Sequence, residues 1–87
     1  MSNVVYTSLD TILTGQKIHS AIINSGYSVR QIQEMLKLED PQPIYRWIHG
    51  RCMPSTDNLY KLSKIFNMHM EELLVEMGAG DKADKSE

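Results

Sequence analysis

The sequence predicts an all-α fold made of five short helices. From Thr14 onward, apolar residues recur three and four positions apart, the spacing that places them on one face of a helix. Glycine, proline and capping residues separate these stretches at points where helices begin and end. One stretch, NVVYTS at residues 3–8, has the composition of a β-strand, but we expect no partner strand for it in an otherwise helical chain.

Composition places the chain among soluble globular proteins. Its 87 residues suffice for one domain, and 41% of them are hydrophobic and 23% charged. No apolar run approaches the roughly 18–20 residues of a membrane span, and the first residues lack the pattern of a signal peptide. The single cysteine, Cys52, cannot form an internal disulfide, which fits a reducing compartment. We therefore expect a cytoplasmic protein with no membrane contact.

The net charge argues against one class of nucleic-acid-binding protein. A formal charge of −2 does not suit a histone-like protein that binds DNA regardless of sequence. A sequence-specific binder stays open, because the local distribution of charge matters more than the total. Between Gly15 and Met77, five of the seven basic residues precede Met53, so the middle of the chain is mildly basic.

Caps and stops mark the first two expected helices. The first begins near Thr14 and ends at Gly26, since glycine suits the position just past a helix end. Its inward face carries Ile18, Ala21 and Ile22. Ser28, with Gln31 three positions later, forms a capping box that opens the second helix. The inward face of that helix carries Val29, Ile32 and Leu36.

The stretch PQPIYRWIHG, residues 41–50, predicts a third helix between prolines and a glycine. Proline is tolerated in a helix only in its first turn. Two starts are open: Pro41 with Asp40 as its cap, or Pro43 with Gln42 as a weaker cap, because a residue before proline avoids the helical conformation. On a wheel of about 100° per residue, the core face carries Ile44, Trp47 and Ile48. The opposite face carries Gln42, Arg46 and His49, with Tyr45 at its margin.

Two more helices complete the prediction. Ser55 caps the fourth, Asp57 in its first turn suits the helix dipole, and Asn67 ends it in a left-handed conformation. Its inward residues are Leu59, Leu62, Ile65 and Phe66. The fifth carries Met70, Leu73, Leu74 and Met77. Its cap position falls on His69, a poor N-cap, so it has the weakest start of the five.

The chain divides into a central domain and two ends. Residues 14–77 form the predicted domain. Residues 1–13 are either an arm that pairs with a second subunit or an extension of the first helix. The final stretch, GAGDKADKSE at residues 78–87, is small, polar and charged, which predicts a disordered tail.

Residues 28–74 resemble the helix-turn-helix regulators of the lambda repressor-like type, also called the Cro/CI or XRE family. The resemblance rests on the spacing of Ile44, Gly50 and the Pro54-Ser55 pair, followed by a leucine-rich helix and a closing MEELL segment. It implies a five-helix bundle that places its third helix in the major groove of double-stranded DNA. It also implies a homodimer on an inverted-repeat operator.

The resemblance assigns roles to the outward face of the third helix and to its flanks. Arginine can donate two hydrogen bonds to guanine, and glutamine can pair in the same way with adenine. The residues expected to read bases are Gln42, Tyr45, Arg46 and His49. Phosphates are expected at two helix N-termini and at basic side chains, namely Ser28, Arg30, Lys37, Arg51 and Ser55.

Several residues depart from the family pattern. Lys37 stands where a turn glycine is common, and the turn from Ile32 to Ile44 is one residue longer than usual. Gln33 replaces a small buried alanine, which predicts wider packing of the second and third helices. Ile48 replaces a common glutamate.

Catalytic and metal-binding interpretations have little in their favour. His49 and Cys52 are two zinc-ligand types three residues apart, but no second pair has usable spacing. Cys52 has no recognisable catalytic partner. We therefore expect no cofactor, no metal and no enzymatic activity.

The sequence predicts a sequence-specific DNA-binding transcription regulator of the repressor type. The rival hypothesis is a protein-interaction module on the same scaffold, either antitoxin-like or a co-regulator. The negative net charge and the unusual Gln33 and Ile48 favour the rival slightly. Salt dependence separates the two, because contacts with phosphates weaken steeply as salt rises.

Overall fold

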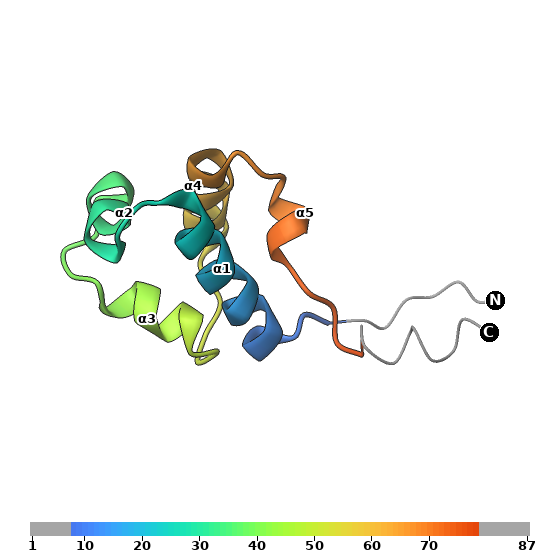
Figure 1. Cartoon of the computed structure of the whole chain (residues 1–87). Coiled ribbons are helices and arrows are strands. Elements are labelled where there is room, and N and C mark those ends of the chain that lie inside the picture. The colour runs from blue at the N-terminus through green and yellow to red at the C-terminus, as the bar shows by residue number, and fades with distance from the viewer. Residues whose placement is uncertain (1–7, 79–87) are drawn as a thin grey trace.

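The structure, a computed structural model, describes residues 8–78 and confirms the predicted all-α fold (Figure 1). Within that range the chain forms α1 (Thr11–Ser25), α2 (Val29–Leu36), α3 (Gln42–Ile48), α4 (Thr56–Phe66) and α5 (Met70–Leu73). None of these helices is long and apolar enough to cross a membrane.

The helices enclose one hydrophobic core. α1 packs against α3, α4 and α5, and α2 packs against α4. As a result, α2 and α3 lie at the end of the bundle away from α5 (Figure 1). The buried apolar residues are Ile18, Ala21, Ile22, Ile32, Leu36, Ile44, Trp47, Leu59, Leu62 and Leu73. The inward faces predicted for the first four helices are thus confirmed, with Val29, Ile48, Ile65 and Phe66 partly buried beside this core.

α1 begins three residues before the predicted start at Thr14. The cause is Asp10, whose carboxylate accepts a hydrogen bond of 2.8 Å from the main-chain N–H of Leu13. An aspartate that accepts from an N–H in the first turn is a strong N-cap. The predicted end is right, because Gly26 adopts a left-handed φ of 82°.

The capping box of α2 is confirmed in both directions. The Ser28 hydroxyl accepts from the Gln31 main-chain N–H at 3.1 Å, and the Gln31 side chain accepts from the Ser28 N–H at 2.8 Å. The helix ends at Lys37, which has φ 60° and ψ 41°. Lys37 therefore holds the left-handed conformation that glycine adopts more readily.

α3 begins between the two predicted starts. Pro41 is the cap residue, and the Asp40 carboxylate accepts from the Gln42 main-chain N–H at 2.8 Å. Gln42 is thus the first helical residue, although it precedes Pro43. Gly50 follows the helix at φ 74°, and its neighbour Arg51 donates from its N–H to the Arg46 carbonyl at 2.9 Å. Proline and glycine therefore bound α3 as the sequence predicted.

α4 has the predicted caps, whereas α5 is shorter than predicted. The Ser55 hydroxyl accepts from the Asn58 N–H at 3.1 Å, and Asn67 ends α4 at φ 57°. α5 is a single turn whose cap residue, His69, makes no side-chain capping bond. The prediction that Leu74 and Met77 belong to this helix was wrong, since Leu74 has an extended ψ of 140° and Met77 lies beyond the helix.

The segment after α5 is held extended by the start of the described chain. The Asp10 N–H donates to the Val75 carbonyl at 2.7 Å, and the Met77 N–H donates to the Ser8 carbonyl at 2.8 Å. These bonds frame an antiparallel bridge between Leu9 and Glu76. Ser8, the last residue of the strand-like stretch, thus has a partner in its own chain, which corrects the expectation of none. The rest of the proposed arm and the predicted tail from residue 79 lie outside the described residues.

Candidate nucleic-acid interface

α3 has one buried face and one exposed face, as the wheel predicted. Ile44 and Trp47 are 0% and 4% exposed. Four side chains on the other face are exposed: Gln42, Tyr45, Arg46 and His49. The helix therefore anchors in the core through apolar side chains and presents hydrogen-bonding side chains to the solvent.

The four residues predicted to read bases line one shallow hollow on the surface, together with Arg51. No carboxylate belongs to the described lining of this hollow. We call these five residues the α3 face. Of the residues predicted to bind phosphate, only Arg51 joins it. The other four do not line this hollow: Ser28 and Ser55 lie at the starts of α2 and α4, Arg30 in α2 and Lys37 at its end.

The exposed side of α3 is organised in two rows, each one helical turn long. Tyr45 and His49 form one row, with ring centroids 6.4 Å apart and ring planes 21° from parallel. Gln42 and Arg46 form the other, since residues four apart are neighbours on a helix surface. Each row thus pairs side chains of similar chemistry, rings in one and long polar groups in the other.

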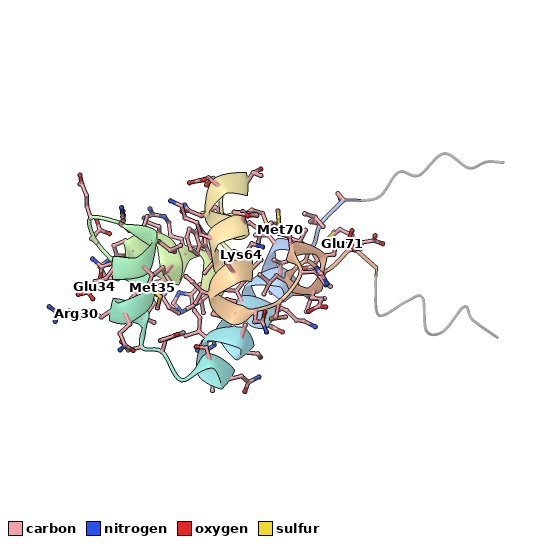
Figure 2. The ribbon with its side chains drawn as sticks, turned by 90° about the horizontal axis from the view of Figure 1, so that it is seen from above. Arg30, Glu34, Met35, Lys64, Met70 and Glu71 are labelled. Carbon is pink, nitrogen blue, oxygen red and sulfur yellow. The ribbon has the colours of Figure 1, made fainter. Side chains whose placement is uncertain are left out.

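Among the described residues, the two arginines of the α3 face, Arg46 and Arg51, form no ion pair. In the described part of the chain, the basic residues in ion pairs are Arg30, 3.8 Å from Glu34, and Lys61, 3.1 Å from Asp57. Figure 2 shows Arg30 and Glu34 on the outer side of α2, pointing away from α4. Arg46 and Arg51 are in neither pair, so their guanidinium groups can meet an anion without losing a partner.

Ser28 and Ser55 are the N-caps of α2 and α4, as the sequence predicted. Each hydroxyl accepts a hydrogen bond from a main-chain N–H of its own helix. Each hydroxyl still has its own hydrogen to donate, and the remaining N–H groups of the first turn point outward. These two helix starts can therefore contact phosphates without giving up their caps.

Two glycines let α1 and the end of α3 pack closely: Gly50, which the sequence predicted as the stop after α3, and Gly15, whose role was not predicted. A Cβ atom added to Gly15 would collide with the Trp47 carbonyl oxygen and would lie 2.9 Å from that of Ile48. A Cβ on Gly50 would lie 2.8 Å from the Cα of Ile12. Glycine inside a helical repeat is itself a signal, because it costs about 1 kcal/mol relative to alanine unless packing requires it. Gly15 thus lets α1 approach the end of α3 that carries His49.

The role of Thr14 was also not predicted from the sequence. Its side chain is 1% exposed, and its hydroxyl oxygen accepts from the Val75 main-chain N–H at 3.0 Å. This bond connects α1 to the segment after α5. No local pattern could have predicted it, since 61 positions separate the two residues.

The described residues contain no group of three or more His, Cys, Asp or Glu side chains that could hold a metal ion. Cys52 is an exposed free thiol in the connection between α3 and α4. The side chains of the α3 face therefore supply hydrogen-bond donors, aromatic rings and positive charge.

Comparison with known proteins bears on the fold. No protein-family model and no curated protein matches the chain. Among solved structures, it is similar to the restriction-modification controller protein C.AhdI from Aeromonas hydrophila, with a TM-score of 0.66 and 22% sequence identity. The match covers 74% of this chain and 96% of that one. The likeness confirms the predicted fold class, an all-α bundle of five helices with a helix-turn-helix.

Proposed function

We propose that the chain is a sequence-specific DNA-binding transcription regulator that reads the major groove with α3. The observation that carries this proposal is the α3 face, where four exposed base-reading candidates and Arg51 share one hollow without a carboxylate. An α-helix fits the major groove, and each base pair shows a distinct hydrogen-bonding pattern there. The fold shared with a restriction-modification controller protein supports the proposal.

Each residue has a separate task in this proposal. Arg46 donates two hydrogen bonds to guanine, Gln42 pairs with the edge of adenine, and Tyr45 packs on a thymine methyl group or a phosphate. Arg51 and Lys37 neutralise phosphates on either side of α3. The starts of α2 and α4 add main-chain N–H donors, which fix the register of the protein on the duplex.

We further assign the chain to the lambda repressor-like family and to the repressor class, acting as a homodimer on an inverted repeat. Two copies related by a two-fold axis would present two α3 helices to half-sites about 34–36 Å apart, one turn of DNA. A dimer bound across a promoter would exclude polymerase, and the small domain needs no effector for that action.

Selection of duplexes from a random DNA pool at moderate salt tests the proposal. An enriched inverted repeat, with one position relaxed in Arg46→Ala, is the expected outcome. Binding should also fall roughly 10³-fold or more between 50 and 200 mM salt if about six phosphates are contacted. A pool that stays random with a folded protein would reject the proposal.

A second candidate function, a protein-interaction module, is favoured by one feature. A hollow on α4 and the segment leading into α5 is lined by Tyr60, Ser63, Lys64, Met68, His69, Met70 and Glu71. Figure 2 shows Lys64 and Met70 on facing sides of α4 and α5, with Glu71 pointing outward. Methionine and an aromatic ring beside both charges suit a protein partner. Binding there would show little dependence on salt.

A further inference from the structure

We propose that Gln33 is a positioning residue for α3. Its side chain holds the turn that leads from α2 to α3, and so sets where the start of α3 lies. This inference rests on the proposed function, since it concerns how the helix that reads DNA is presented. It goes further because Gln33 lies in α2, outside the α3 face, and acts on DNA binding through another part of the chain.

The turn after α2 begins with two main-chain hydrogen bonds. Lys37, which follows the helix, has a left-handed φ of 60°. The Lys37 N–H donates to the Glu34 carbonyl at 3.1 Å, and the Leu38 N–H donates to the Gln33 carbonyl at 3.0 Å. These two bonds form a Schellman motif, a common ending for a helix that is followed by a left-handed residue.

The Gln33 side chain adds a third bond that the motif itself does not contain. Its Nε2 group donates to the Leu38 carbonyl oxygen at 3.3 Å. A Schellman motif uses the N–H of this residue and makes no use of its carbonyl. Both main-chain polar groups of Leu38 are therefore bonded to Gln33, the N–H to its carbonyl and the carbonyl to its side chain. A small residue at position 33 has no group that reaches this carbonyl.

Helix packing gives the turn little further support. In the described part of the chain, α3 packs chiefly against α1 and α2 chiefly against α4, so direct packing between α2 and α3 is slight. This arrangement agrees with the expectation that Gln33, in place of a small alanine, widens the packing of these two helices. Leu38 is partly buried against the core between them. The bond from Gln33 to Leu38 is thus a specific connection between α2 and the chain that enters α3.

The start of α3 is the part that depends on this connection. The other end of α3 lies against α1 at Gly15. Gln42, the first residue of the helix, follows Leu38 by four positions and precedes the first buried residue, Ile44. A turn held at Leu38 therefore limits where Gln42 lies. Without the bond, the start of α3 gains freedom while its far end stays in place.

The test compares Gln33→Met and Gln33→Ala with wild type in the full chain. Methionine keeps the length of the side chain and removes its N–H donors, whereas alanine removes both. Gln33 is only partly buried, so both variants should fold, and thermal melts establish that they do. Gln16→Met, at an exposed position of α1, is the matched control. The NMR resonance of the Leu38 carbonyl carbon should shift in both Gln33 variants and stay in place in Gln16→Met.

Affinity is then measured for the selected operator duplex and for an unrelated duplex of the same length. Both Gln33 variants should lose roughly 3- to 10-fold in affinity for the operator, which corresponds to one net hydrogen bond. Affinity for the unrelated duplex should change little, so the ratio of the two affinities falls. A residue needed only for stability would lower the melting temperature and leave this ratio unchanged, as Gln16→Met should.

The inference is overturned if the Leu38 carbonyl resonance does not shift, or if both Gln33 variants keep the ratio of affinities of wild type. Equal losses for the two duplexes also overturn it, because they would make Gln33 a contact that does not depend on sequence. If wild type selects no operator, the proposed function fails and the positioning role fails with it. The carbonyl resonance would then still decide whether Gln33 holds the turn.

Discussion

Gly15 of α1 lies directly against the main chain of Trp47 in α3. A Cβ atom on Gly15 would collide with the Trp47 carbonyl oxygen and crowd that of Ile48, 2.9 Å away. The contact joins the helix at the centre of the bundle to the proposed recognition helix. The placement of α3 against α1 therefore requires a residue without a Cβ atom at position 15.

Gly15→Ala should destabilise the fold by about 1–3 kcal/mol, because a backbone carbonyl cannot rotate aside as a side chain can. The direction of the stability change is informative, because replacing glycine by alanine inside a helix ordinarily stabilises the fold by about 1 kcal/mol. Thermal denaturation beside Ser20→Ala, an exposed position of the same helix, gives the comparison. A rise in melting temperature for Gly15→Ala would contradict the packing described for α1 and α3.

Lys37→Gly should stabilise the fold and weaken DNA binding at once. The left-handed conformation at φ 60° is strained for lysine and free of strain for glycine, which predicts a gain of about 0.5–1 kcal/mol. Loss of the ammonium group should weaken binding to all duplexes alike. Lys37→Ala is the control, because it loses the charge but keeps the strain. Urea denaturation in which both variants gain equal stability would disprove this explanation.

Thr14→Val should lower the free energy of unfolding by about 1–3 kcal/mol, because the Val75 N–H loses its acceptor. The hydroxyl is the only feature that matters here, so Thr14→Ser should retain most of the stability. Amide hydrogen exchange at Val75 provides a direct reading. The account expects faster exchange in Thr14→Val than in Thr14→Ser, and equal protection in the two variants would refute it.

Trp47→Ala and Tyr45→Ala test the two faces of α3. Trp47 is 4% exposed, and truncating it should cost about 3–5 kcal/mol, enough to unfold a domain of this size. Tyr45 is 40% exposed, and its truncation should change stability by only about 0.5 kcal/mol. Circular dichroism melts measure the stability of both variants. Similar losses of stability in the two would mean that Trp47 does not face the core and Tyr45 does not face the solvent as described.

Local sequence signals predicted most of the fold. The capping box at Ser28, the serine cap at Ser55 and the left-handed Asn67 are interactions within a few residues of one another, so their spacing was readable directly. The two faces of α3 were predicted for the same reason, since helical periodicity is local. Asp10 carried the same kind of signal, and the early start of α1 was a missed prediction.

Long-range relationships were beyond the reach of those signals. The bond between Thr14 and Val75 and the bridge between Leu9 and Glu76 join opposite ends of the sequence. They also explain why α5 ends after one turn, which periodicity alone did not indicate. The α3 face was predicted as a set of residues, whereas the role of Gly15 in placing that set required the structure.

The central claim is that α3 is the surface that contacts DNA, and NMR titration of the labelled full chain with a selected duplex tests it most directly. Amide and side-chain resonances of Gln42, Tyr45, Arg46 and His49 should shift, together with those at the starts of α2 and α4. The resonances of Tyr60, Lys64 and Met70, which line the second hollow, should not shift. Shifts confined to that second hollow, with α3 unchanged, would contradict the account.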